Sequence, residues 1–234
     1  MKKLKNFINY FSRKELILWL SSLLFITVSF FIFDREGILP LAASLIGATA
    51  LILCAKGNPL GQLLIIVFSC LYGIISYSCA YYGEMITYLG MSAPMALLAL
   101  ISWMRNPYNE SGSEVKVNKI SAKEIPLIVI LSATVTAAFY FILDTLGTAN
   151  LIPSTVSVTT SFVAVYLTFR RSPYYAAAYA ANDLVLIVLW TMATFSDISY
   201  LSVLICFITF LANDIYGFFN WLKMRNRQSN SAGE

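Results

Sequence analysis

The stretch FLANDIYGFFNWLKM, residues 210–224, lies in the last apolar segment of the chain and decides how the rest is interpreted. It is mostly apolar, yet it carries Asn213, Asp214 and Asn220 within about three turns of the helix that we expect here. An ionised carboxylate at the centre of a membrane helix costs about 2.5–3.5 kcal/mol on the insertion scale. Asp214 therefore needs a polar partner or a function, and we expect it to mark a site.

The composition is that of an integral membrane protein. Of the 234 residues, 59% are hydrophobic and 12% are charged, and the mean hydropathy is +0.73. These values exclude a soluble globular domain. The basic residues are scattered over short loops without a patch of aromatic and basic side chains, so we exclude a nucleic-acid partner as well. The partner implied by the composition is the lipid bilayer.

A helix needs roughly 20 apolar residues to cross the hydrocarbon core, which leaves room for about eight spans in an all-α membrane protein. Polar turns separate the apolar segments, and one longer polar loop at 105–123 divides the chain in two. The predicted spans are 15–33, 38–55, 60–79, 85–103, 125–143, 151–169, 173–193 and 198–222.

The basic residues orient these spans. With a cytoplasmic N-terminus and eight spans, the lysines and arginines fall on the cytoplasmic side and Arg35 alone lies outside. Short loops rich in Lys and Arg stay in the cytoplasm, so we expect both termini there. The outer turns carry acidic residues instead, namely Asp34, Glu36, Glu84, Asp144 and Asp197.

The chain contains no histidine, which removes the Ser–His triad and the usual zinc ligand. Its cysteines lie in apolar segments without C-x-x-C spacing, where they are typically small buried hydrophobes. We therefore expect no disulfide, no metal site and no cofactor. The cysteines are Cys54, Cys70, Cys79 and Cys206.

Two parts of the chain resemble each other. The turn KGNP at 56–59 resembles RRSP at 170–173, and SWMR at 102–105 aligns with NWLK at 220–223. One connecting span gives both copies the same orientation, and transporters built from parallel three-helix repeats bind substrate between the copies near mid-membrane. The predicted organisation is 1–37, tail and extra first helix; 38–104, first three-helix repeat; 105–150, loop and connector helix; 151–224, second repeat; 225–234, polar disordered tail.

The repeat also separates candidate site residues from structural ones. Asn182-Asp183 and Asn213-Asp214 have no polar counterpart in the first copy, which points to an asymmetric site. A hydrogen-bond network between helices is the alternative for these pairs, and anchoring at the membrane interface is the alternative for the repeated tryptophans. The candidate substrate-binding residues are Asn182, Asp183, Trp190, Asn213, Asp214, Tyr216, Gln62, Tyr72, Asn220, Trp103 and Trp221.

Amides, carboxylates and aromatic rings facing one cavity suit a small ligand with a flat ring and hydroxyl groups. Aromatic faces stack on such a ring and also hold it when it is cationic, while amides fix hydroxyl groups in direction. Inside the predicted spans there is no lysine or arginine, and no glycine-rich loop opens a helix. A phosphate would find no partner, so we expect a phosphorylated substrate to be rejected.

The motifs resemble those of the PnuC family of vitamin transporters over about 38–225. The matching segments are KGNPLGQ at 56–62, LYG at 71–73, YGE at 82–84, SW at 102–103 and NDIYGFFNW at 213–221. The resemblance implies a 3+1+3 arrangement like that of the SWEET sugar transporters, a homotrimer in the bacterial inner membrane, and facilitated diffusion of nicotinamide riboside that cytosolic phosphorylation then traps. Other relatives carry thiamine, riboflavin or deoxynucleosides.

The leading hypothesis is a nicotinamide riboside uniporter. In it Asn182, Asn213 and Gln62 hold the ribose hydroxyls or the carboxamide, and Trp190 and Tyr216 stack on the ring. Either Asp183 or Asp214 offsets the pyridinium charge. Proton coupling through one of these carboxylates is the second hypothesis. A membrane-embedded lipid enzyme and a non-transporting scaffold or receptor are the remaining alternatives.

Overall fold

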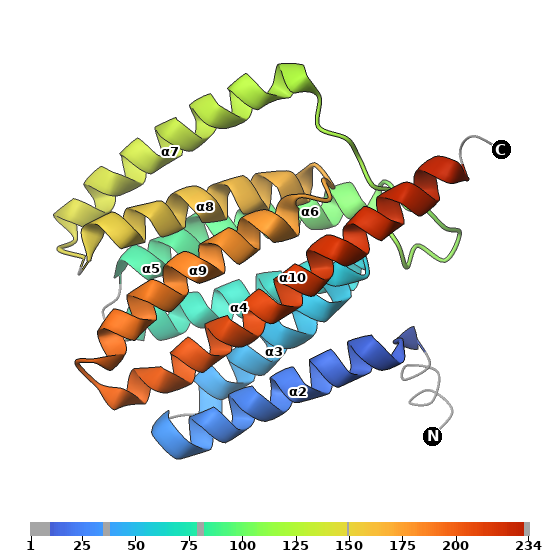
Figure 1. Ribbon diagram of the computed structural model, residues 1–234. Coiled ribbons are helices and arrows are strands. Elements are labelled where there is room, and N and C mark those ends of the chain that lie inside the picture. Colours follow the sequence, from blue (N-terminus) through green and yellow to red (C-terminus); the bar gives the residue numbers. More distant parts are fainter. Residues whose placement is uncertain (1–9, 35–37, 79–81, 149, 232–234) are drawn as a thin grey trace.

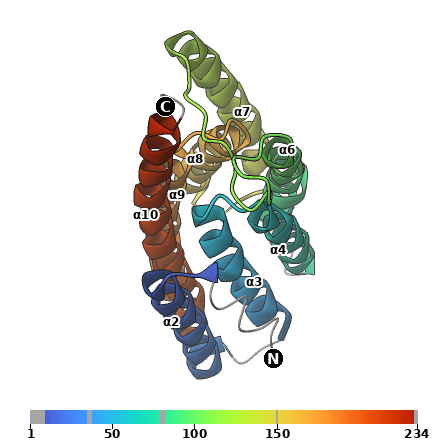
Figure 2. The same cartoon turned by 90° about the vertical axis from the view of Figure 1, so that its right-hand side faces the viewer.

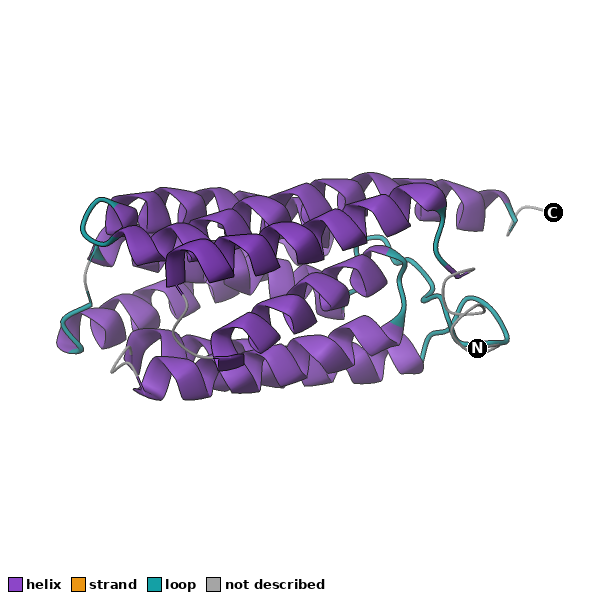
Figure 3. Cartoon of the chain, turned by 90° about the horizontal axis from the view of Figure 1, so that it is seen from below, coloured by secondary structure: helices purple, strands orange, loops and turns teal. Residues whose placement is uncertain are grey.

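The computed structural model describes residues 10–34, 38–78, 82–148 and 150–231, and the regular elements of this part of the chain are all helical. Eight of its helices are long and apolar enough to cross a membrane, as the sequence predicts. They run side by side in an elongated bundle, with the first and the last described residues at one end of it (Figures 1 and 3). The protein is an all-α, multi-pass membrane protein. Arg35, Glu36 and Cys79 lie outside the described residues.

The bounds of the helices follow the predicted spans closely. Short turns of π-helix (η1, η2) and 3-10 helix (η3, η4) extend several of them. In chain order they are α2 (Arg13–Ser29), η1 (Phe30–Asp34), α3 (Ile38–Ala55), α4 (Pro59–Ser78), α5 (Tyr82–Ile86), η2 (Thr87–Ser92), α6 (Ala93–Met104), η3 (Ala122–Glu124), α7 (Ile125–Thr145), α8 (Leu151–Phe169), α9 (Tyr175–Thr194), η4 (Ile198–Tyr200) and α10 (Leu201–Asn230).

The prediction that the tail is disordered from residue 225 is wrong for residues 225–230, because α10 continues to Asn230. The extension is held by the polar loop between α6 and η3. Gln228 accepts a hydrogen bond from the backbone N–H of Val117 (2.8 Å) and donates one to the carbonyl of Val115 (3.1 Å), and Arg227 pairs with Glu114. The loop therefore stabilises a turn of helix that composition alone does not predict.

The fourth span is not one regular helix, because the π-turn η2 separates α5 from α6. Pro94 follows at the start of α6 and has no backbone N–H, so the regular hydrogen bond to the carbonyl of Gly90 is impossible. Turns of this kind occur often at functional sites. Here the turn aims Thr87, Tyr88 and Ser92 into the cavity described below.

The helices pack as two groups of three with two helices outside them. The first group is α3, α4 and α5–α6, and the second is α8, α9 and α10; α3 packs against α10 and α6 packs against α8 where the groups meet. Helix α7 packs against α8 on one side of the bundle, and α2 packs against α3 and α10 on the other (Figure 2). We call the end of the bundle that holds the first and the last described residues the termini end, and the other the opposite end.

The contacts where the groups meet at the termini end come in pairs. Trp103 donates its indole N–H to the carbonyl of Thr168 (2.9 Å), and Trp221 donates its own to the carbonyl of Cys54 (2.9 Å). The residue before each tryptophan also donates to a backbone carbonyl of the other group. Ser102 donates to the carbonyl of Phe169 (2.9 Å), and Asn220 donates to the carbonyl of Ala55 (2.8 Å).

The two turns of the aligned motifs also match. Gly57 and Arg171 both have a left-handed backbone, with φ of 67° and 57°. Such a conformation is unfavourable for a residue with a side chain, so its recurrence at Arg171 indicates that the turn is required there.

Candidate functional site

A cavity of about 640 Å³ lies between the two groups of three helices. At the opposite end it reaches exposed residues of the connections, including Gly147 and Ser196. Toward the termini end it stops at Cys54, Gln62 and Tyr175, each about 3% exposed. The cavity therefore opens at the opposite end and is closed at the termini end.

Cys54, Gln62 and Tyr175 form the floor of the cavity. Between this floor and the termini end, more buried side chains close the bundle. Trp103 and Trp221 are fully buried with ring centroids 5.3 Å apart, and Tyr175 packs edge-on against Trp221 at 4.8 Å. Val115 of the polar loop is fully buried in the same cluster, beside Met224. Its backbone N–H bonds to the carbonyl of Gly57 (3.0 Å), which fastens the loop across this end.

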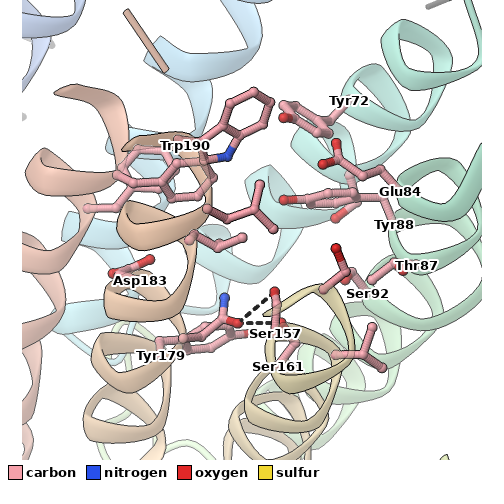
Figure 4. Close-up of a pocket in the computed structure, with 18 of the residues that line it drawn as sticks. Tyr72, Glu84, Thr87, Tyr88, Ser92, Ser157, Ser161, Tyr179, Asp183 and Trp190 are labelled. Atoms are coloured by element: carbon pink, nitrogen blue, oxygen red, sulfur yellow. Dashed lines mark hydrogen bonds between the residues drawn. The ribbon is translucent and has the colours of Figure 1, made fainter. Parts of the chain in front are cut away.

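Aromatic rings line the middle of the cavity. Tyr72 of α4 and Tyr88 of η2 lie with ring centroids 4.5 Å apart on one side. Trp190 of α9 lies on the other side, backed by Phe207 at 6.5 Å, and Figure 4 shows its indole pointing toward Tyr72. Rings on two sides of a space suit a flat ring between them.

Hydrogen bonds to α8 orient Asn182 in the cavity. Its Oδ1 lies within hydrogen-bonding distance of three hydroxyl groups on α8, those of Ser157 (3.1 Å), Thr160 (2.8 Å) and Ser161 (3.1 Å). Figure 4 shows the bonds from Ser157 and Ser161. Because these hydroxyls fix the carbonyl side of the amide, the NH₂ group remains as a positioned donor for a ligand.

Three carboxyl groups face the cavity, and among its described lining residues there is no lysine or arginine. Asp183 and Asp214 are 4% and 5% exposed and interact directly with each other near the closed end. Within the described residues Oδ2 of Asp183 has no hydrogen-bond partner. Glu84 stands nearer the open end, beside Tyr72 (Figure 4). The cavity is thus suited to a cation and unsuited to an anion.

The structure brings six of the predicted site residues to this cavity. They come from α4, α9 and α10, so both groups of helices contribute. The six are Gln62, Tyr72, Asn182, Asp183, Trp190 and Asp214.

The other five predicted residues lie outside the cavity lining. Trp103, Trp221 and Asn220 tie the two groups together at the termini end, as described above, and the tryptophans are too deeply buried to be interfacial anchors. Asn213 donates to Ser22 of α2 (2.9 Å), and Tyr216 donates its hydroxyl to Glu15 of α2 (3.0 Å). Residues 213 and 216 therefore face the extra first helix, and Tyr216 does not stack in the cavity.

Several lining residues are not predicted by the sequence. Glu84 was assigned to an outer turn, and Tyr88 belongs to the π-turn, whose altered phase the sequence does not reveal. Tyr179 lies one helical turn before Asp183 on α9, so its position on the same face was the available signal. The serines of α8 carried no comparable signal in the sequence, because serine is common in membrane helices.

A sequence comparison shows the family to which the chain belongs. The sequence model of the family described as nicotinamide mononucleotide transporter matches residues 37–223. The chain belongs to the nicotinamide mononucleotide transporter family. The match begins at about α3, so α2 precedes the part that defines the family.

The chain is also similar to individual transporters. The nicotinamide riboside transporter PnuC of Neisseria mucosa is 27% identical over 215 residues, covering 90% of this chain and 82% of that protein. The protein of the same name from Haemophilus influenzae is 19% identical over 212 residues, covering 90% and 91%. A crystal structure of the vitamin B3 transporter PnuC superimposes with a TM-score of 0.79 at 25% identity, covering 93% of this chain and 94% of that one. These proteins are transporters, so this chain is a transporter and not an enzyme.

Proposed function

We propose that this protein carries nicotinamide riboside across the bacterial inner membrane by facilitated diffusion. The observation that carries the proposal is the cavity, which combines aromatic rings on two sides, a positioned amide and carboxyl groups, with no basic residue among its described lining. Nicotinamide riboside presents a flat cationic ring, a carboxamide and ribose hydroxyls. The names of the Neisseria and Haemophilus relatives support this substrate.

Each lining group has a matching part of this ligand. The pyridinium ring lies between Trp190 and Tyr72, where aromatic faces attract a cation. The NH₂ group of Asn182 donates to the carboxamide oxygen or to a ribose hydroxyl. Gln62, which donates to Cys54 Sγ (3.2 Å) at the floor of the cavity, offers its carbonyl oxygen to the deepest hydroxyl group. Asp183 and Asp214 lower the electrostatic cost of the positive ring in this buried site.

The same groups discriminate against the phosphorylated nucleotide. Two unit charges about 8 Å apart interact by about 2 kcal/mol at an effective dielectric constant of 20. A phosphate facing one such carboxylate therefore loses about 30-fold in affinity, with no basic side chain among the described lining to compensate. We accordingly propose the riboside and not the mononucleotide as substrate, although the family description names the latter. Phosphorylation in the cytosol would then retain the vitamin.

Transport requires the closed end to open. We propose that the two groups of three helices are parallel repeats, joined by α7, which move relative to each other around the cavity. The paired hydrogen bonds of Trp103 and Trp221 support this organisation, because equivalent residues of the groups make equivalent contacts. With the termini end in the cytoplasm, the cavity faces outward here, and the tryptophans and Val115 separate when the ligand is released. A homotrimer, which the resemblance implies, belongs to this proposal as well.

Uptake into proteoliposomes tests the proposal. Purified protein should give saturable uptake of labelled nicotinamide riboside that stops when the concentrations on the two sides are equal, without any ion gradient. Excess unlabelled riboside should compete, and nicotinamide mononucleotide should not. Saturable uptake of thiamine without uptake of the riboside would contradict the substrate, and binding without flux would favour a receptor.

A proton-coupled cycle is the second candidate, and the contact between Asp183 and Asp214 favours it. Two carboxylates that interact directly repel each other when both are ionised, and either a proton or the cationic ligand relieves the repulsion. In this case uptake would concentrate the riboside above its external level when the outside is acidic. Uptake that is unchanged when the proton gradient is collapsed would exclude this candidate.

A further inference from the structure

We infer that Glu84 is a specificity-determining residue, which selects a cationic aromatic ring over a neutral ring of the same shape. This inference deepens the proposed function and rests on it. It assigns the charge selection at the open part of the cavity to one residue, in addition to the Asp183–Asp214 pair near the closed end.

The position of Glu84 carries the inference. It lies on α5, just before the π-turn that aims Tyr88 into the cavity, and its side chain is only partly exposed. Figure 4 shows its carboxyl group directly beside Tyr72 and above Tyr88, on the side of the cavity opposite Trp190. A ring placed between Trp190 and Tyr72 would therefore have this carboxylate at its edge.

The charge of Glu84 lacks a basic partner in the described part of the chain. The ion pairs there involve Glu15, Glu124 and Glu114 instead. A side-chain hydrogen bond with Tyr72 orients the carboxyl group of Glu84. Carboxylates in membrane segments that are not paired typically serve ligands or ions. Here the aromatic neighbours form two sides of a cation site, and the carboxylate supplies the counter-charge.

The test compares two ligands that differ in charge alone. Nicotinamide riboside carries a positive ring, whereas the C-riboside of pyridine-3-carboxamide has nearly the same shape and a neutral ring. Binding to the purified full chain is measured by calorimetry for the wild type, for Glu84→Gln, which keeps the shape of the side chain, and for Asp144→Asn. Asp144 is an exposed carboxylate at the same end of the bundle and does not line the cavity, so it controls for general surface charge.

The wild type should bind the cationic ligand at least about tenfold more tightly than the neutral one. Glu84→Gln should lose about tenfold for the cation and less than about threefold for the neutral ligand, and Asp144→Asn should change neither. Equal losses for both ligands in Glu84→Gln would overturn the inference. A wild-type ratio near one would also overturn the inference, even if that variant does not fold. Failure of the wild type to bind nicotinamide riboside at all would instead count against the proposed function.

Discussion

In the proposed function, Trp190 is one of the residues on which the ligand ring stacks. It is 7% exposed, packs against Tyr200 at 5.4 Å and Phe207 at 6.5 Å, and forms one side of the cavity. Trp190→Phe keeps an aromatic face and should change the affinity for nicotinamide riboside by less than about threefold. Trp190→Ala removes stacking and cation–π attraction of about 1–2 kcal/mol and should weaken binding by about 5- to 30-fold. Calorimetric titration measures both, and equal affinity of the Ala variant and the wild type would contradict this role.

Adjacent residues on α10 show why the site could be predicted only in part. Asn213 and Asp214 follow each other and are both buried, but successive side chains on a helix point about 100° apart. One therefore faces α2, where it meets Ser22, and the other faces the cavity. The sequence shows that both are polar and deep in the membrane. It does not show which neighbouring helix each one meets, because that depends on the packing of α2.

Among the elements, α2 is attached to the rest of the bundle by a buried ion pair. Glu15, with a side chain 5% exposed, pairs with Lys56 at 2.9 Å and also accepts hydrogen bonds from the Ser12 backbone N–H and from Tyr216. Removing one partner of a buried pair leaves an uncompensated charge and costs about 3–5 kcal/mol. Lys56→Met should therefore lower the melting temperature strongly, whereas Glu15→Gln combined with Lys56→Met should restore most of it. A double variant as unstable as the single one would show that the pair has no such coupling.

The α3–α4 hairpin depends on Gly61. A Cβ atom at this position would lie 2.7 Å from the backbone nitrogen of Cys54 and 3.0 Å from the carbonyl oxygen of Ala50, which cannot move aside as a flexible side chain could. Gly61→Ala should cost at least about 2 kcal/mol through overpacking. Gly217 on α10 is the matched control, because a Cβ there would meet Ala176 and Ala55 at an ordinary 3.5 Å. Thermal unfolding in detergent compares the two, and equal destabilisation would contradict this packing.

The loop between α6 and η3 is predicted to control opening of the termini end. Val115→Asp places a carboxylate in the apolar cluster beneath Cys54, where only an open termini end would hydrate it. The variant should make Cys54, which is 3% exposed, react faster with a membrane-impermeant thiol reagent added from the termini side. Lys116→Asp on the exposed neighbouring residue is the control and should leave the rate unchanged. Equal reactivity in a folded Val115→Asp variant would argue against the loop as a closing element.

The elements themselves were largely predictable, and their exceptions have local causes. Apolar length and polar turns predicted the eight spans, because backbone groups in lipid must be paired within helices. The π-turn before Pro94 and the burial of Val115 were not predicted. The first changes the phase of a helix without changing its composition, and the second arises from contacts of a polar loop with Gly57 and Gln228, which are distant in sequence.

At the scale of the whole molecule, the predicted two-part organisation explains where the cavity lies. The turns at Gly57 and Arg171 share the same unusual backbone, and the tryptophan in the last helix of each group bonds to the end of the first helix of the other group. The repeat stays a prediction, supported by these matched contacts. In the proposed function, the carboxylates of the second group and Glu84 of the first make the cavity selective for a cationic ligand.

The affinities for nicotinamide riboside and nicotinamide mononucleotide, measured side by side by calorimetry on the purified wild-type protein, test this account most directly. The two ligands share the ring, the carboxamide and the ribose, and they differ only in the phosphate. The acidic cavity predicts saturable binding of the riboside and an affinity for the mononucleotide at least about 30-fold lower. Equal affinities, or tighter binding of the mononucleotide, would contradict the account.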